Sequence, residues 1–475
     1  MKPYKSVVLL IFLASDQFLL DSADCAEKPN IIYIMVDDLG YGDLGCYGQK
    51  VIQTPNLDRM AAEGMRFTDH YAGHTVCRPS RLVLWLGQHV GHTKLAGNRP
   101  RNLTGAEPTV AKRLQSVGYK TGGVGKWALG NVSTPDEIGN AGHPNNNGFD
   151  YWYGYLNQSY AHNYYPTFLW ENDKQVTLPG NVIGDYPNGR GRVASTRVSY
   201  SHDFMTNAAL GFVRRNAMNP FLLHIHWTIP HANNEGGRAL GDGMEVPDYG
   251  LYKNKDWPNP EKGFAAMISR MDRDIGRLFA LLKELKIDEN TVVIFTSDNG
   301  PHQEGGHKVD FFDSNGPLTG YKRSLHDGGI RVPMIARWPG QIKPGSTSDL
   351  PSAFWDFLPT ACELANVEPP KNVDGISYLP TLRGENDRQK KHEYLYWTSL
   401  EGATSVGVRM GDWKLVKYRG PKKPPRNQPV KSDWRLYDLG KDIGETTDIS
   451  RKHPQIVEKM IGLLQRDELL PKAGG

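Results

Sequence analysis

Three largely apolar runs stand out along the chain, at residues 31–36, 221–227 and 291–297, and a shorter one spans residues 119–124. The runs are continuous instead of alternating between apolar and polar positions. This pattern is typical of strands that are buried on both faces, as in a parallel sheet covered by helices. The sequence therefore predicts central strands of such a sheet at these four places.

Helical patterns lie between these runs. Asn56 is a suitable N-cap for a helix over residues 57–63, and Gly64 stands at its stop position. Apolar residues recur at helical spacing over residues 264–282, which predicts one long amphipathic helix before the last run. Alternating strands and helices predict an α/β fold, with a large, mixed and mostly parallel sheet flanked by helices.

A smaller unit is predicted at the C-terminal end, with an antiparallel sheet and a final helix over residues 454–465. Its predicted strands span residues 393–398, 405–410, 413–418 and 434–439. We therefore expect a catalytic α/β domain over residues 26–370 and a C-terminal subdomain over residues 371–475.

Polar side chains follow the central runs. They are Asp37, Asp38, Lys126, His231, Asp298 and Asn299. Because ligands bind beyond the carboxyl ends of strands in such sheets, we expect these side chains to converge on one crevice. Three carboxylates and an amide oxygen are hard ligands, which favours Ca²⁺ or Mg²⁺ over Zn²⁺. The alternative interpretation is that both acidic pairs are ordinary turns.

Composition narrows the class of protein. The 475 residues include 56 Lys+Arg and 52 Asp+Glu, for a net charge of +4. Because positive and negative side chains are nearly equal in number, the net charge gives no electrostatic signal for nucleic-acid binding, and no nucleic-acid partner is expected. Four cysteines are too few for a dense disulfide framework, and Cys46 and Cys362 form either one bridge or two buried thiols.

The N-terminus has the layout of a secretory signal. Two lysines precede an apolar run over residues 7–14, and small residues follow around residues 22–26. We interpret residues 1–25 as a signal peptide and expect an exported protein, periplasmic or secreted. A lipid anchor at Cys25 is disfavoured because Asp24 is an unusual neighbour for a lipoprotein cysteine. No later segment is apolar for long enough to predict a transmembrane helix.

The most specific signal is the segment His74-Thr75-Val76-Cys77-Arg78-Pro79-Ser80-Arg81. Its Cys-x-Pro-Ser-Arg pentapeptide resembles the signature of type I sulfatases, in which the cysteine is oxidised to formylglycine. Further motifs occur in the order of that family, at residues 37–42, 54–58, 125–127, 230–231, 297–300 and 328–333. Over nearly its whole mature length, the chain resembles this arylsulfatase-like family, whose fold is that of the alkaline phosphatase superfamily.

The resemblance implies one bound Ca²⁺ and a defined set of catalytic groups. Its implied metal ligands are Asp37, Asp38, Asp298, Asn299 and the modified Cys77. By the same resemblance, Arg81 would orient the hydrated aldehyde, Lys126 and Lys322 would neutralise charge on the sulfuryl group, and His231 would protonate the departing alcohol. A formylglycine-generating enzyme is the implied partner during maturation.

Two stretches depart from the pattern of the family. Ala128 stands where family members commonly have a histidine that contacts the modified residue. The hypothesis is that another histidine or a carboxylate takes over, with His74 and His302 as candidates. Leu86 and Gln88 replace a usual threonine and arginine, in the stretch that the modifying enzyme reads.

Two short motifs carry little weight. Gly123-x-Gly125-x-x-Ala128 superficially matches a dinucleotide fingerprint, but its downstream acidic residue has no clear strand context. His224 and His226 lie on one face of a strand, which fits half a metal site but is more typical of packed histidines.

Two longer stretches bear on the substrate. Residues 151–170 are dense in aromatic rings that either stack on a sugar or pack against the sheet, and His162 in the same loop is a candidate for substrate selection. Residues 414–435 hold eight basic side chains against one acidic one, which indicates either a platform for a polyanionic glycan or a solvated hairpin tip.

The sequence therefore predicts a Ca²⁺-dependent sulfatase that hydrolyses a sulfate monoester on a sulfated carbohydrate. Two alternatives stay open. One is phosphoester or phosphonate-ester hydrolysis on the same scaffold. The other is a weakly active glycan-binding protein, which is motivated by Ala128 and by the altered stretch around Leu86.

Overall fold

The computed structural model describes residues 28–93, 101–130, 140–399, 402–417 and 434–470. The predicted signal peptide and most of the basic stretch lie outside the described residues. Among the helices that are described, none is long and apolar enough to cross a membrane.

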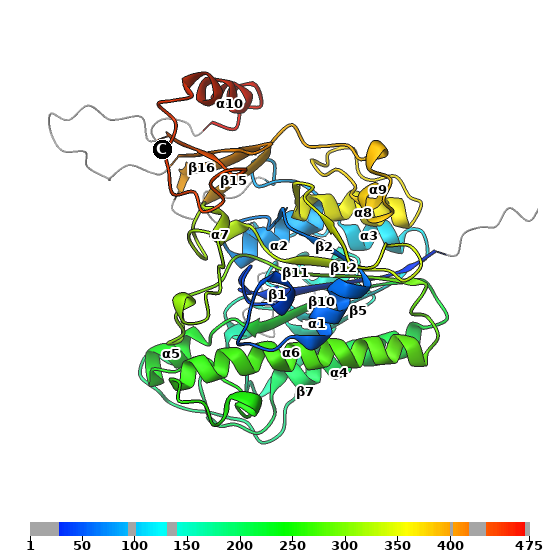
Figure 1. The fold of residues 1–475 in the computed structure, drawn as a ribbon. Helices are drawn as coiled ribbons and strands as arrows, with labels where there is room; N and C mark the ends of the chain where they lie inside the picture. Colours follow the sequence, from blue (N-terminus) through cyan, green and yellow to red (C-terminus); the bar gives the residue numbers. More distant parts are fainter. Residues whose placement is uncertain (1–27, 94–100, 131–139, 400–401, 418–433, 471–475) are drawn as a thin grey trace, which may run out of the picture.

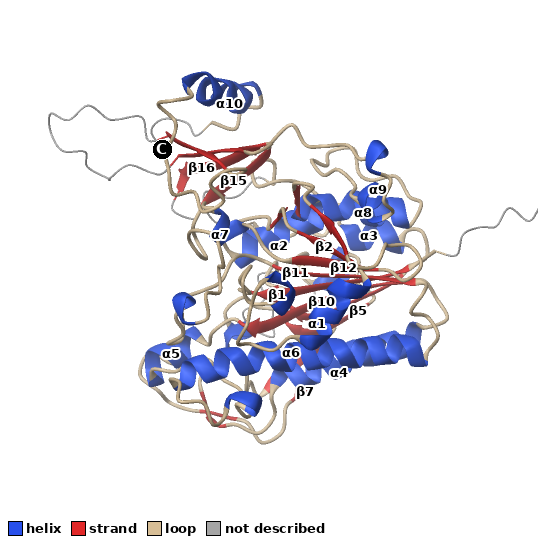
Figure 2. Cartoon of the chain, in the orientation of Figure 1, coloured by secondary structure: helices blue, strands red, loops and turns tan. Residues whose placement is uncertain are grey.

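The largest sheet of the described residues has ten strands and is mixed (Figures 1 and 2). In spatial order the strands are β13 (Ser346–Ser348), β2 (Met65–Phe67), β12 (Met334–Arg337), β11 (Thr291–Ser297), β1 (Asn30–Asp37), β10 (Phe221–Pro230), β4 (Lys120–Lys126), β5 (Tyr151–Tyr155), β6 (Phe168–Glu171) and β7 (Lys174–Thr177). The neighbours from β11 to β5 are all parallel, and β12 and β6 run antiparallel on either side. The predicted α/β fold with a mixed, mostly parallel sheet is confirmed.

Helices cover both faces of this sheet (Figure 1). One face carries α1 (Pro55–Glu63), α4 (Ser201–Asn216) and α6 (Asn259–Glu284), and the other carries α2 (Cys77–Leu86), α3 (Val110–Gln115) and α8 (Phe357–Leu364). Shorter elements in the connections are α5 (Asn234–Leu240), α7 (Asp327–Ile330), α9 (Leu379–Leu382), β3 (His70–Tyr71) with β14 (Ser352–Ala353), and β8 (Val182–Ile183) with β9 (Ala194–Thr196).

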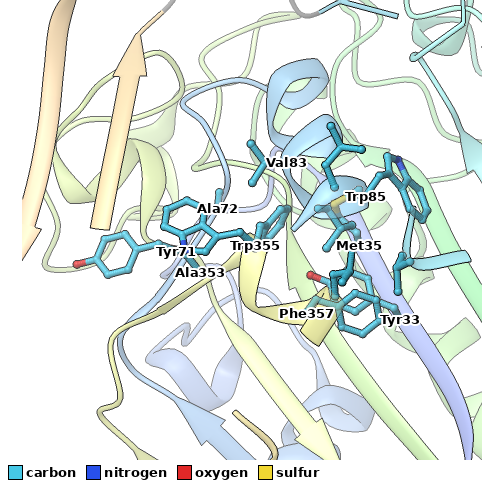
Figure 3. Packing of buried hydrophobic residues seen from close by; sticks show 14 of the residues in the cluster. Tyr33, Met35, Tyr71, Ala72, Val83, Trp85, Ala353, Trp355 and Phe357 are labelled. Carbon is cyan, nitrogen blue, oxygen red and sulfur yellow. The ribbon is translucent and has the colours of Figure 1, made fainter. Parts of the chain in front are cut away.

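The central strand β1 shows why the runs are continuously apolar. Side chains alternate between the faces of a strand. Ile32 and Ile34 therefore join the core under α6, while Tyr33 and Met35 join the core under α2 and α8. Figure 3 shows Tyr33 against Phe357 of α8, with ring centroids 4.2 Å apart. Both faces of β1 are thus covered by buried apolar side chains. Polar side chains that bind or react with a ligand are therefore expected at its carboxyl end.

A second, antiparallel sheet consists of β15 (Leu395–Ser399), β16 (Gly402–Met410), β17 (Trp413–Lys417) and β18 (Trp434–Asp438), and it is followed by α10 (Pro454–Arg466). This confirms the predicted C-terminal sheet and helix, whereas the division at residue 370 stays a prediction. Lys414 of β17 is fully buried and pairs with Asp327 of α7 and with Glu445. Lys414 therefore forms a buried ion pair between the C-terminal sheet and α7, which fits neither interpretation of the basic stretch, a glycan platform or a solvated hairpin tip.

The structure corrects the predicted helix cap and decides between the two alternatives for the cysteines. Asn56 is not the N-cap of α1, since the helix begins at Pro55 and Thr54 precedes it. Instead, the backbone N–H groups of Asn56 and Leu57 donate to the carboxylate of Asp272 on α6, at 3.0 and 2.8 Å. Cys46 and Cys362 are free thiols, Cys46 only partly buried, so the alternative of a bridge is excluded.

Candidate functional site

Four parallel strands bring the predicted polar residues together. Their spatial order is β11, β1, β10, β4, so that Asp298, Asp37, His231 and Lys126 stand at successive carboxyl ends. Gly125 lets β4 approach β10 closely just before Lys126, because a Cβ there would lie 1.9 Å from the carbonyl oxygen of His226. The residues that sequence reasoning expected in one crevice thus share one edge of the sheet.

Cys77 is the first residue of helix α2, and its side chain is buried at this edge. Its Sγ lies 3.4 Å from Nζ of Lys126 and 3.2 Å from Nε2 of Gln158. Burial raises the pKa of the Cys77 thiol. An unmodified thiol here is therefore protonated near neutral pH and is a poor nucleophile.

Arg81, one turn further along α2, is fully buried behind Cys77. Its guanidinium donates to Oδ2 of Asp298 at 2.8 Å and to the carbonyl oxygen of Lys126 at 2.8 Å. It also lies 3.4 Å from Asp37. Arg81 thus fixes two carboxylates and the end of β4, so a single helix turn connects the cysteine to the acidic cluster.

Asp37, the last residue of β1, and Asp38, which follows it, each have a lysine partner. Asp37 Oδ2 lies 2.6 Å from Nζ of Lys126, and Asp38 Oδ2 lies 2.7 Å from Nζ of Lys322. Asn299 donates from Nδ2 to the other oxygen of Asp38, at 2.7 Å. The two lysines come from distant parts of the sequence, and Nζ of Lys126 also lies 3.4 Å from Sγ of Cys77.

Unpaired buried oxygens indicate where a cation fits. Oδ1 of Asp37 and Oδ1 of Asn299 are buried without a hydrogen-bond partner among the described residues. Burial and the nearby charge of Asp37 raise the pKa of Asp298. Burial alone would also raise the pKa of Asp37, but the charge of Lys126 holds it well below its usual range. Three close carboxylates with two unsatisfied oxygen ligands fit a hard divalent cation.

His231 follows the end of β10 and faces the same cluster. Its Nδ1 lies 2.6 Å from the carbonyl oxygen of Ala232, while Nε2 lies 3.5 Å from Asp38 Oδ2. A proton on Nδ1 therefore satisfies that carbonyl and leaves Nε2 facing the carboxylates of Asp38 and Glu304. Burial and then the charge of Lys322 lower the pKa of His231.

Three further residues support His231 and Lys322. His162 stacks on His231, with centroids 4.8 Å apart and an angle of 21° between the planes. Its Nδ1 lies 3.0 Å from Glu235, and Glu304 lies 3.3 Å from Nζ of Lys322. The sequence pointed to His162 through the aromatic loop, but it gave no signal for Glu304.

The two histidines suggested as substitutes at Ala128 have other partners. Nδ1 of His74 lies 3.4 Å from the hydroxyl of Thr75, and Nε2 of His302 lies 3.0 Å from the carbonyl oxygen of Pro230. Besides Lys126, the side chain in hydrogen-bond contact with Cys77 is Gln158, which sequence reasoning did not single out. His224 and His226 are buried and packed against Trp85, as expected for core histidines.

The aromatic stretch divides into core and surface. Trp152, Tyr155 and Tyr164 are buried, which agrees with packing against the sheet. Tyr160 is 46% exposed, and it borders a cavity of about 310 Å³ that Phe168 also lines. The cavity is also lined by Asn157, the neighbour of Gln158.

Comparisons with known proteins agree with this site. A family model described as Sulfatase matches residues 29–367, and one described as N-sulphoglucosamine sulphohydrolase, C-terminal, matches residues 319–468. An N-acetylgalactosamine-6-O-sulfatase of Bacteroides thetaiotaomicron is 28% identical, over 94% of this chain and 94% of its own. An N-acetylgalactosamine-6-sulfatase of Canis lupus familiaris is 31% identical, over 83% of this chain and 73% of its own.

A solved structure of Ps i-CgsB in complex with k-i-k-neocarrahexaose superimposes with a TM-score of 0.74 at 27% identity, covering 93% of this chain and 92% of that one. The match to the first family model spans well over half of the 475 residues. The protein therefore belongs to the sulfatase family, within the alkaline phosphatase superfamily, and is a sulfuric ester hydrolase.

Proposed function

We propose that this sulfatase removes sulfate from a sulfated carbohydrate, with Cys77 converted to formylglycine and one Ca²⁺ bound beside it. The observation that carries the proposal is the position of Cys77. It lies at the start of α2, within 3.4 Å of Lys126, which in turn lies 2.6 Å from Asp37 of the acidic cluster. Burial raises the pKa of the Cys77 thiol, so without conversion this side chain would be a poor nucleophile.

The cation is held by Asp37, Asp38, Asp298 and Asn299 together with the modified residue 77. The unpaired oxygens of Asp37 and Asn299 support this assignment. A bound Ca²⁺ lowers the pKa of a hydroxyl next to it and draws charge from a sulfate oxygen. The oxygen-only donor set of these four side chains favours Ca²⁺ or Mg²⁺ over softer metals, and the family resemblance favours Ca²⁺.

The remaining residues bind and orient the sulfate group. Lys126 and Lys322 present ammonium groups to the crevice and neutralise charge on the sulfuryl oxygens. His231 directs Nε2 toward the leaving oxygen, and it can pass a proton to the departing alcohol once Nε2 has taken one up, with Nδ1–H still held by the carbonyl of Ala232. Arg81 pairs with Asp37 and Asp298 and so holds these two carboxylates in a fixed orientation next to residue 77.

The carbohydrate assignment rests on the relatives and on the rim of the site. Several curated relatives are named N-acetylgalactosamine-6-sulfatase, although others are steryl-sulfatases, and one solved relative was determined with k-i-k-neocarrahexaose. Tyr160 and Phe168 offer aromatic faces on which a sugar ring can stack. The guanidinium of Arg192 lies 5.2 Å above the ring of Tyr160 and adds positive charge at this rim.

Export, and maturation by a formylglycine-generating enzyme, complete the proposal. Export is inferred from the signal-like sequence of residues 1–25, and maturation from the motif at residues 77–81. The proposal also keeps the division at residue 370 into a catalytic domain and a C-terminal subdomain.

Sulfate release tests the reaction and its substrate. A panel of monosulfated sugars, matched by an aryl sulfate and an aryl phosphate, is assayed with Ca²⁺ and after chelation. The proposal expects Ca²⁺-dependent release of sulfate from at least one sugar and a clear preference for the aryl sulfate. A preference for the aryl phosphate would instead favour the phosphoester alternative.

A further inference from the structure

Gln158 occupies a fixed place beside Cys77. It lies between β5 and the turn at Tyr160–His162, and its neighbour Asn157 accepts hydrogen bonds from the N–H groups of Ser159 and Tyr160, at 2.7 and 3.3 Å. One residue earlier, the carbonyl oxygen of Leu156 accepts from the N–H of Ala128 at 3.2 Å. The loop is therefore attached to the strand end that carries Lys126.

The amide of Gln158 is only half used. Nε2 lies 3.2 Å from Sγ of Cys77, whereas Oε1 is buried and has no hydrogen-bond partner among the described residues. A buried acceptor without a partner is unfavourable, so such atoms call for an explanation. Exchanging the positions of the amide oxygen and nitrogen still leaves one of them without a partner, because a thiol offers a single heavy atom.

A hydrated aldehyde at residue 77 would satisfy both amide atoms. It carries two hydroxyl groups on one carbon, where the cysteine carries one sulfur. One hydroxyl oxygen can accept from Nε2, and the other hydroxyl can donate to Oε1. The amide thus matches the hydrated, modified side chain better than it matches the thiol.

We propose that Gln158 is a catalytic residue of this sulfatase, which holds the hydrated aldehyde at residue 77 through one donated and one accepted hydrogen bond. The inference rests on the proposed conversion of Cys77. It explains how the site manages with a methyl group at Ala128, since the only side-chain nitrogens within hydrogen-bond reach of Sγ among the described residues belong to Lys126 and Gln158. A carboxamide does not titrate near neutral pH, so Gln158 supplies orientation and no proton transfer.

The test uses Gln158→Met, which keeps the length of the side chain and removes both hydrogen bonds. Gln115→Ala, at an exposed hydrogen bond to Asp150, is the matched control. For each full-length protein, mass spectrometry of the Cys77 peptide gives the aldehyde content, and all rates are divided by it. Thermal unfolding reports whether each variant is folded.

Two readouts separate a catalytic from a structural role. The first is labelling of folded protein by an aminooxy reagent, which reacts with the free aldehyde and not with its hydrate. Losing two hydrogen bonds to the hydrate should make labelling of Gln158→Met about 10-fold faster than that of the wild type. The second is kcat, which should fall about 10- to 100-fold with little change in KM and an unchanged shape of the pH–rate profile.

Suppose that Cys77 is converted and that Gln158→Met has the labelling rate and the kcat of the wild type. This result would overturn the role of Gln158 and leave the proposed function untouched. A wild-type protein whose Cys77 stays a thiol and which releases no sulfate would overturn the proposed function, and the inference with it. The two failures are therefore distinguishable from the mass of one peptide.

Discussion

The guanidinium of Arg81 donates two hydrogen bonds to a single oxygen of Asp298, from Nη2 at 2.8 Å and from Nε at 3.2 Å. Both side chains are fully buried. The contact joins the helix that begins with Cys77 to the end of strand β11, so the spacing between nucleophile and acidic cluster depends on it.

Replacing Arg81 with lysine should damage activity and stability together. Lysine keeps the charge but cannot bind Asp298 and the carbonyl of Lys126 at the same time. We expect the free energy of unfolding to fall by about 2 kcal/mol and kcat/KM to fall about 100-fold. Urea denaturation and sulfate release measure the two effects, with Arg214→Lys at an exposed ion pair as control. Wild-type activity of Arg81→Lys would show that this contact does not position the site.

Calcium should stabilise the folded protein through the cluster at β1 and β11. A ligand that binds only the folded state raises the unfolding temperature as its concentration rises. We expect millimolar Ca²⁺ to raise the unfolding temperature of the wild type, chelation to reverse the shift, and Asp298→Asn to abolish it. Glu393→Gln, at an exposed pair with Arg466, should keep the shift. An equal Ca²⁺ response in Asp298→Asn would place the ion elsewhere.

Glu235 should make stability depend on pH in the acidic range. Burial raises its pKa, but the hydrogen bond and charge of His162 and the charge of Arg192 lower it to about 2. A carboxyl group with a depressed folded-state pKa stabilises the protein above its unfolded pKa, and this stabilisation is lost as pH falls through the folded pKa. Solvent screening of the partly exposed arginines reduces the effect of this shift to about 1 to 2 kcal/mol at neutral pH.

Glu235→Gln should therefore be less stable than the wild type at pH 7, and the difference should shrink steadily between pH 5 and pH 3. Urea titrations at several pH values measure the difference. Glu284→Gln, at the exposed pair with Arg214, should show little difference at any pH. A gap for Glu235→Gln that stays constant down to pH 3 would contradict the assigned pKa.

Tyr160 should matter for sugar substrates and not for small aryl sulfates. Its exposed ring borders the cavity that Phe168 lines. Loss of one stacked ring should raise KM for a sulfated oligosaccharide about 5-fold and leave the aryl sulfate unchanged. Phe311→Ala removes an exposed ring elsewhere and serves as control. Equal KM values for the oligosaccharide in Tyr160→Ala and the wild type would remove Tyr160 from the substrate site.

The sequence predicts the strand ends well because burial on both faces leaves a clear signal. The run over residues 291–297 coincides with β11, and Asp298 follows it as expected. Once the strands are parallel neighbours, the convergence of their end residues follows from the topology. Such a prediction needs no knowledge of side-chain contacts.

Contacts between segments that are distant in the sequence could not be predicted from local patterns. Asp272 receives the N–H groups at the start of α1 from 216 residues away, so the local pattern wrongly favoured Asn56 as the cap. Lys414 carries a charge like its neighbours in the basic stretch, and only tertiary burial shows that it pairs with Asp327. Gln158 stands in a loop without periodicity, and its role becomes visible only beside Cys77.

The state of residue 77 tests the account most directly. Protein from the native host, or from a host with a formylglycine-generating enzyme, is digested, and the Cys77 peptide is analysed by mass spectrometry alongside a sulfate-release assay. We predict the mass that results when the CH₂–SH group is replaced by an aldehyde, and loss of sulfate release in Cys77→Ala. An unmodified thiol in a protein that binds sulfated sugar without releasing sulfate would contradict it.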